Sequence, residues 1–216
     1  MTALFQHYLP PAPAMLPYVS GRFYASQHAR AVGGAVAMTA NRPFCVPYVL
    51  ARPGLFSAMA VSVTTGGAGL LRMALAARGI TPPRAFDLAR ELTARGGYVV
   101  QPGGAIRGLI YAPAAAWLRE VPRLPAEVRV DVPAEAIPAM LRDGGMFIAS
   151  VHPSIRRTGA EPPSRGGHLV LVFGAEGGAL RFHNPSGDTV ASQCDARLPV
   201  AEFARFYAGR GIAIGV

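Results

Sequence analysis

His168 and Asn184 are the two side chains whose types and spacing best fit a catalytic pair. His168 opens the apolar run His168-Leu-Val-Leu-Val, and Asn184 comes 16 residues later, directly after a second short run. If the runs are neighbouring antiparallel strands, the start of the first lies beside the end of the second. The amide of Asn184 can then fix the tautomer of the imidazole, which a general base in acyl transfer requires. A structural strand histidine followed by an ordinary Asn184-Pro185 turn fits the same spacing.

The second half of the chain predicts the antiparallel sheet that would position this pair. Turn residues Glu176-Gly177-Gly178 indicate a hairpin between the two runs. A buried-type strand is expected over 146–151, and further strands over 168–174 and 179–183. An amphipathic helix over 199–209 and a closing strand over 212–216 follow.

The first half predicts helices. Residues 1–56 are rich in proline and are expected to form an irregular arm that wraps the main body. Helices are expected from near Gly66 to Gly79 and over 83–95. A short strand over 98–101 and a turn over 102–104 follow. Two more helices are then expected, one interrupted at Pro113 and ending near Glu120, the other over 133–142. Thr64 or Thr65 and Thr81 are the expected N-caps. Helices followed by an antiparallel sheet indicate an α+β fold, and we expect one domain over 1–216.

These segments together resemble the double-glycine leader (bacteriocin-processing) peptidase-like family of the papain-like cysteine peptidases, over residues 57–216. Gly167-His168-Leu-Val-Leu-Val resembles the strand that carries the family's base, and Asn184-Pro185-Ser-Gly resembles the motif that ends its next strand. The resemblance implies a papain-like fold, with N-terminal helices packed on a C-terminal antiparallel sheet. It also implies that His168 is the base and Asn184 its orienting partner.

The sequence departs from the family at the nucleophile. The segment that contains Thr64-Thr65-Gly66-Gly67 falls where the family has Gly-Cys-Gly-Pro, so Thr65 takes the place of the cysteine. A hydroxyl has a far higher pKa than a thiol, so His168 would have to deprotonate it during attack. Thr65 fits a nucleophile, a substrate-binding hydroxyl or only a helix cap. Cys45 is the alternative nucleophile if the arm delivers it to His168.

Three further residues are candidates for substrate binding. Gly66 and Gly167 would leave room for a substrate backbone beside the nucleophile position and the base. His152 ends the strand before a polar loop, where it would line a cleft or remain a surface residue. His183, by strand alternation, faces the opposite side from Asn184 and should not join the site.

Composition narrows the function classes. The 216 residues carry a formal charge of +9 with no lysine, which indicates a solvated basic surface or attraction to an acidic partner such as a carrier protein. The only run of cations is Arg156-Arg157, and no basic and aromatic interleaving indicates nucleic-acid binding. No segment is apolar enough to span a membrane and no secretory signal is evident, so a cytoplasmic protein is expected. Two cysteines form no metal motif, and neither a metal nor a cofactor is expected.

The expected function follows from the resemblance and the missing cysteine together. We expect a protein that acts on a peptide or an acyl-carrier-bound substrate by transfer, cyclisation or hydrolysis, in a specialised biosynthetic pathway. The alternative is a degenerate relative that binds a peptide or carrier protein without cleaving it. The oligomeric state does not follow from the sequence.

Overall fold

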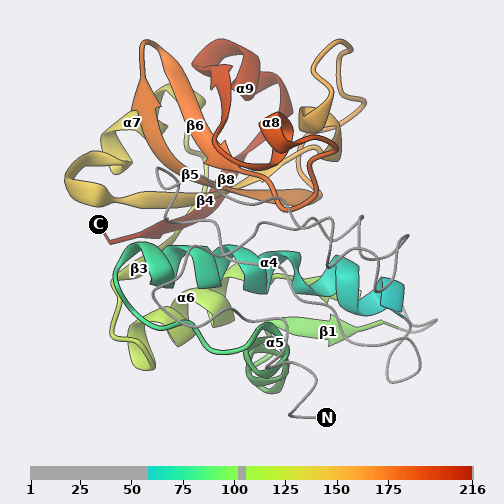
Figure 1. Cartoon of the computed structure of the whole chain (residues 1–216), viewed down its shortest axis with the longest axis vertical. Coiled ribbons are helices and arrows are strands. Elements are labelled where there is room, and N and C mark those ends of the chain that lie inside the picture. The colour runs from blue at the N-terminus through green and yellow to red at the C-terminus, as the bar shows by residue number, and fades with distance from the viewer. Residues whose placement is uncertain (1–57, 102–105, 216) are drawn as a thin grey trace. The chain divides into compact units, whose positions relative to one another are not determined.

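The structure is a computed structural model that describes residues 58–101 and 106–215, with side chains from Gly66 onward except at Val100. The chain divides into two compact units, Met1–Ile110 and Tyr111–Val216, which we describe separately (Figure 1). The N-terminal arm, Cys45 within it and the turn at 102–104 lie outside the described residues. The single domain over 1–216 stays a prediction.

The first unit contains two helices and a hairpin. Helix α4 spans Ala58–Ala77, helix α5 spans Ala85–Ala94, and strand β1 (Tyr98–Val100) pairs antiparallel with β2 (Ile106–Gly108). The predicted start of the first helix near Gly66 was wrong, because the helix extends back to Ala58 through small and apolar residues that favour it. Thr64 and Thr65 therefore lie inside α4 and are not its N-cap.

Close packing explains why Gly67 is a glycine although it lies inside α4. A Cβ added there would lie 2.7 Å from Cβ of Leu109 and 3.0 Å from the hydroxyl of Tyr98, so the close approach of these residues needs glycine. The same hydroxyl accepts a hydrogen bond from the backbone N–H of Ala68 at 3.0 Å. Gly67 thus marks a packing contact and not a helix start.

Helix α5 also begins differently from the prediction. Its N-cap is Arg84, without a side-chain cap, so Thr81 was wrongly predicted to cap it. The predicted end is confirmed, since the chain leaves the helix through Gly96 with a φ of +79°. Buried Arg72 of α4 donates from Nε to the carbonyl of Pro83 at 2.8 Å, which ties α4 to the segment before α5.

The second unit is built on a six-stranded antiparallel sheet. Its strand order is β3-β8-β4-β5-β6-β7 (Figure 1). The strands are β3 (Ala126–Arg129), β4 (Met146–Val151), β5 (His168–Glu176), β6 (Ala179–His183), β7 (Ala196–Pro199) and β8 (Tyr207–Ile214). The predicted strands 146–151 and 179–183 are confirmed, β5 is two residues longer than expected, and β8 begins at Tyr207 instead of residue 212. Strands β3 and β7 were not predicted.

Helices and short helical turns complete the second unit. They are α6 (Tyr111–Glu120), η1 (Ala134–Ala136), α7 (Ile137–Met140), η2 (Arg142–Gly144), η3 (Pro153–Arg156), α8 (Val190–Gln193) and α9 (Val200–Phe206). Pro113 does not interrupt α6, because it lies in the first turn, where its missing N–H is tolerated. The single helix predicted over 133–142 is divided into η1, the four-residue helix α7 and η2.

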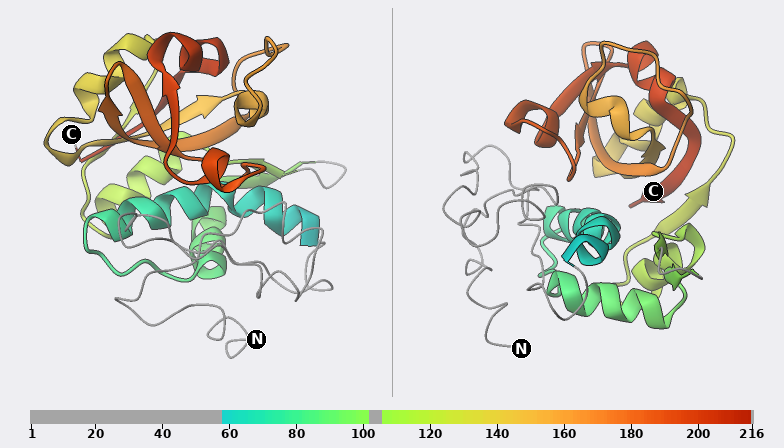
Figure 2. Two further views of the ribbon diagram at one scale, coloured as in Figure 1. Left: turned by 45° about the horizontal axis from the view of Figure 1, so that its top comes forward. Right: turned by 90° about the vertical axis from the view of Figure 1, so that its right-hand side faces the viewer.

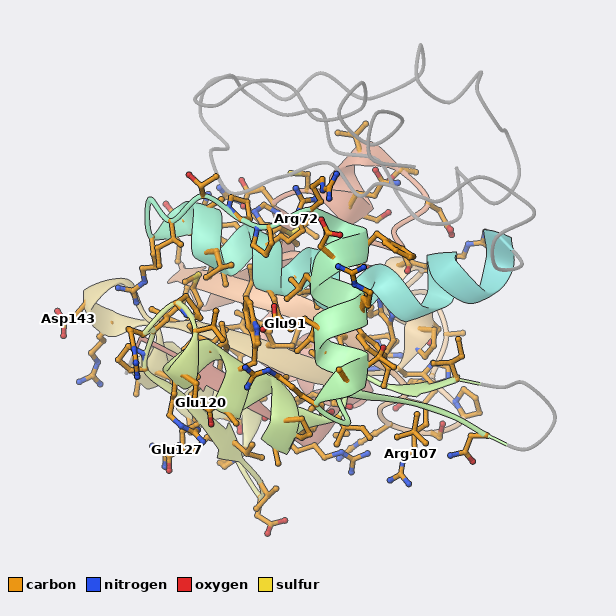
Figure 3. All side chains as sticks on the ribbon, turned by 90° about the horizontal axis from the view of Figure 1, so that it is seen from below. Arg72, Glu91, Arg107, Glu120, Glu127 and Asp143 are labelled. Atoms are coloured by element: carbon orange, nitrogen blue, oxygen red, sulfur yellow. The ribbon has the colours of Figure 1, made fainter. Side chains whose placement is uncertain are left out.

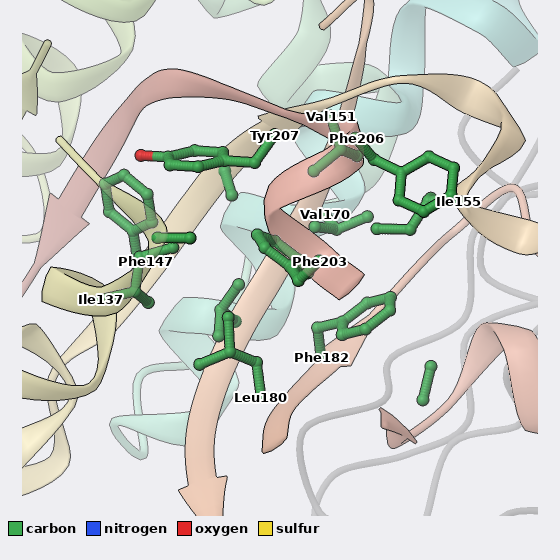
Figure 4. Close-up of a cluster of buried hydrophobic side chains, with 14 of the residues drawn as sticks. Ile137, Phe147, Val151, Ile155, Val170, Leu180, Phe182, Phe203, Phe206 and Tyr207 are labelled. Carbon is green, nitrogen blue, oxygen red and sulfur yellow. The ribbon is translucent and has the colours of Figure 1, made fainter. Parts of the chain in front are cut away.

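The core of the second unit lies between the sheet and helix α9 (Figures 2 and 4). Phe203 of α9 is fully buried and packs edge-on against Phe182 of β6, with ring centroids 5.6 Å apart. Phe147 of β4 meets Tyr207 in the same way at 6.1 Å. All six residues of β4 are buried, in agreement with a sequence that is apolar except at Ser150. The helices-then-sheet order confirms the α+β class.

Charged side chains such as Arg107, Glu127 and Asp143 project into solvent (Figure 3). Within the described residues, no helix is both long and apolar enough to cross a bilayer.

Candidate active site

The hairpin of β5 and β6 brings His168 and Asn184 into contact. The strands are antiparallel with Leu171 opposite His183, so the first residue of β5 lies beside the turn that follows β6. The imidazole Nε2 lies 2.7 Å from Oδ1 of Asn184. The predicted hydrogen bond between the two side chains is therefore present. Their catalytic roles stay predictions.

The surroundings of Asn184 decide which ring nitrogen of His168 carries the proton. Oδ1 of Asn184 also accepts the backbone N–H of Ser186 at 3.1 Å, and an N–H cannot donate to the amide NH2. The atom facing His168 is therefore an acceptor, so Nε2 must donate. In the neutral ring, Nδ1 then keeps its lone pair. This is the tautomer of a general base whose second nitrogen is held by an orienting group.

The environment of His168 keeps its imidazole neutral. Burial lowers the pKa of this half-buried side chain to about 4, the hydrogen bond to Asn184 raises it, and the nearby Arg156 and His152 lower it. At neutral pH the ring is unprotonated and able to accept a proton. A pKa this far below neutrality also makes it a weak base for a hydroxyl nucleophile.

The turn after β6 is held from several sides. Asn184 is fully buried, and its backbone N–H donates to the carbonyl of Gln193 at 2.7 Å. The amide of Gln193 in turn donates to the carbonyl of Gly187 at 2.8 Å. Thr189 and Ser192 form a capping box at α8, the short helix that carries Gln193. Sequence reasoning missed this support, although Thr189-Val-Ala-Ser192 places hydroxyls at the spacing of a capping box.

The glycines before His168 adopt a backbone conformation that other residues rarely reach. Gly166 and Gly167 have φ values of +89° and +87°. A Cβ on Gly166 would lie 3.1 Å from Oγ of Ser150, whereas no atom of the described part of the chain lies within 4 Å of one on Gly167. The space beside Gly167 within this unit agrees with the prediction of room for a substrate backbone, and the binding role stays a prediction.

His152 serves as a cap in the structure. Its Nδ1 accepts the backbone N–H of Ser154 at 3.1 Å and lies 2.7 Å from the Ser154 hydroxyl, so the ring caps η3. Its predicted role in substrate binding is neither supported nor opposed by these contacts.

The structure describes the three residues that could carry a nucleophile, Thr65, Cys45 and Cys194, to different extents. Thr65 and Gly66 lie about two turns inside α4, which begins at Ala58. The side chain of Thr65 and the whole of Cys45 are outside the described residues. Cys194 is buried and disulfide-bonded, so it carries no thiol that could attack.

His183 is separate from the pair, as predicted. It stacks on Phe173 with ring centroids 4.4 Å apart, and its Nδ1 accepts the backbone N–H of Asp195 at 3.1 Å. Among the described residues, no group of three or more histidine, cysteine or acidic side chains is placed to hold a metal ion.

Comparisons with known proteins support the fold. No protein-family model and no curated protein match the sequence. The structure is similar to the crystal structure of a protein described as a C39-like peptidase from Bacillus anthracis, with a TM-score of 0.52 and 14% identity. The match covers 70% of this chain and 88% of that chain. At this identity the likeness shows the fold alone: the chain has the papain-like fold of cysteine peptidases.

Proposed function

We propose that this protein acts on a peptide or acyl substrate by acyl transfer, cyclisation or hydrolysis, in a specialised biosynthetic pathway. The observation that carries the proposal is the hydrogen bond from His168 Nε2 to Asn184 Oδ1, which leaves Nδ1 as the acceptor. A papain-like fold that keeps its base in this tautomer retains half of an acyl-transfer site.

In the proposed reaction, Nδ1 of His168 takes a proton from the hydroxyl of Thr65 as its oxygen attacks the acyl carbon. The same nitrogen then returns the proton to the leaving group, which yields an ester on Thr65. Attack by water on this ester gives hydrolysis, and attack by an amine gives transfer or cyclisation. Asn184 holds the ring and stabilises the imidazolium that forms between the two proton transfers.

The second candidate is a relative that binds a peptide or carrier protein without cleaving it. Two observations favour it. Thr65 lies well inside α4, where the positive end of the helix dipole no longer acts. The lowered pKa of His168 also makes it a weak base for a hydroxyl.

The two candidates are separated by following the masses of substrates. The full chain is incubated with a pool of synthetic peptides and with an acyl-loaded carrier protein, each with and without an added amine. Hydrolysis gives fragments that together gain one water, whereas transfer gives an amine adduct. The matched variants are His168→Gln, which removes the base, and Arg157→Gln, which changes an exposed side chain nearby.

The enzyme proposal expects products from the native protein and from Arg157→Gln, and none from His168→Gln. Equal product formation by His168→Gln would refute the role of the base. A stoichiometric complex without any change of mass would support the binding protein instead. If the partner is an acidic carrier, its affinity falls as salt is added.

A further inference from the structure

Arg156 is a largely buried cation in the loop that leads from β4 to His168. Its side chain is 11% exposed. A guanidinium removed from water must find hydrogen-bond acceptors, and here two are backbone carbonyls. Nε donates to Pro153 at 2.7 Å and Nη1 donates to Ser186 at 2.9 Å. Arg156 therefore joins its own loop to the turn that contains Asn184.

Ser186 is the point where this contact meets the candidate site. Its carbonyl accepts from Arg156, and its N–H donates to Oδ1 of Asn184 at 3.1 Å. The same Oδ1 accepts from Nε2 of His168 at 2.7 Å. A continuous series of hydrogen bonds thus runs from the guanidinium through Ser186 and Asn184 to the imidazole. Any displacement of Ser186 would move the oxygen that orients the ring.

We propose that Arg156 is a positioning residue, which anchors the carbonyl of Ser186 so that Asn184 presents its oxygen to His168. The effect of this role on catalysis rests on the proposed function, whereas the hydrogen bond from Arg156 to Ser186 does not. The neighbouring Arg157 differs from Arg156, because its side chain is 75% exposed.

The charge of Arg156 acts on His168 as well. Burial is the largest cause of the lowered pKa of His168, and the positive charge of Arg156 adds to it, with a smaller contribution from His152. Asn184 is neutral and raises the pKa through its hydrogen bond. The carboxylate of Asp188 lies 3.8 Å from Nη1 of Arg156 and partly offsets its charge. Removal of the guanidinium should therefore change both the charge around the imidazole and its orientation.

Arg157 provides a matched control. It is the next residue, has the same charge, and bonds to the same turn through Asp188, with Nε 2.6 Å from Oδ2. Its described contacts do not include Ser186, and its side chain lies largely in solvent. Arg157→Gln therefore removes one cation near the turn without removing the anchor of Ser186.

The test follows His168 by NMR in the full-length protein, in the native form and in Arg156→Gln, Arg156→Lys and Arg157→Gln. His168→Gln assigns the signals. Two quantities are measured: the hydrogen-bonded Nε2–H signal and the titration midpoint of the Cε1–H signal. Neither requires a substrate, so a failure of the proposed function would leave the test intact.

We expect Arg156→Gln to lose the hydrogen-bonded Nε2–H signal and to lower the titration midpoint, because the hydrogen bond to Asn184 raises the pKa of His168 by more than the charge of Arg156 lowers it. Arg156→Lys keeps the charge but lacks the planar fork that reaches both carbonyls, so it should weaken the Nε2–H signal and lower the midpoint, since the hydrogen bond to Asn184 raises the pKa of His168. Arg157→Gln should leave the Nε2–H signal unchanged. Retention of that signal in both Arg156 variants would overturn the proposal, and Arg156→Lys decides alone if Arg156→Gln does not fold.

Discussion

Replacing Asn184 by Asp changes the charge of the candidate site with little change of shape. The variant keeps an oxygen that can accept from both Nε2 of His168 and the N–H of Ser186. It places a carboxylate 2.7 Å from the ring in place of a neutral amide. If Asn184 is the hydrogen-bond partner of His168, the imidazolium gains a direct counter-ion.

The size of the effect follows from this distance. Two unit charges 2.7 Å apart interact by about 6 kcal/mol at an effective dielectric constant of about 20. Desolvation of the buried carboxylate offsets part of this, and contacts of this kind raise a pKa by about 1 to 3 units. We therefore expect the pKa of His168 to rise from about 4 to between roughly 5 and 7.

The assay is an NMR titration of the His168 Cε1–H signal in the native protein and in Asn184→Asp, with His168→Gln to assign it. The variant should titrate at clearly higher pH and keep a protonated Nε2. A midpoint that stays within about 0.3 of the native value, or falls, would contradict the reasoning, because a contacting carboxylate must stabilise the imidazolium.

Three further predictions concern stability and are measured by denaturant unfolding. The pKa of His168 is lower in the folded chain than in the unfolded chain, so its stabilising contribution is present above about pH 6.5 and is lost as pH falls toward 4. Between pH 7 and pH 5, the free energy of unfolding of native protein should therefore fall by up to about 2 kcal/mol more than that of His168→Gln. An equal loss would argue against a buried neutral imidazole. Gly166→Ala and Gly167→Ala should each cost about 1 kcal/mol or more because of their positive φ, and Gly166→Ala more, because its Cβ is crowded; equal costs would mean that the crowding is relieved. Phe203→Ala should cost about 3 to 5 kcal/mol, against less than about 0.5 for Val130→Ala at an exposed site, and similar costs would contradict the assignment of the core.

The parts of the fold that the sequence predicts well are those with a strong local pattern. Strands β4 and β5 are mostly apolar, β6 places the buried Leu180 and Phe182 two residues apart, and Gly177-Gly178 marks the turn of the hairpin. Once the hairpin is assigned, the contact between His168 and Asn184 follows from antiparallel geometry alone. The pair of His168 and Asn184 could therefore be predicted from the sequence alone.

Other features depend on contacts between distant residues. Gly66 and Gly67 suggested a helix start, whereas Gly67 in fact makes room for Leu109. The start of β8 was not predicted because Gly211 interrupts the strand pattern. A Cβ added at Gly211 would lie 2.0 Å from the carbonyl oxygen of Ile148 on the neighbouring strand. Strands β3 and β7 have four residues each, which is too short for a clear period.

Arg156 shows the same limit at the site itself. Its neighbour in the sequence is an exposed arginine, and only the tertiary contact with Ser186, 30 residues away, distinguishes the two. A single sequence carries no signal for such a contact. The positioning of a catalytic pair by its surroundings is therefore the part that the structure adds.

The most direct test of this account is the tautomer of His168 at neutral pH, measured by nitrogen-15 NMR of its ring in the native protein. The account predicts a proton on Nε2, donated to Asn184, and an unprotonated Nδ1 that is available as a base. A ring protonated on Nδ1, or on both nitrogens, would contradict it.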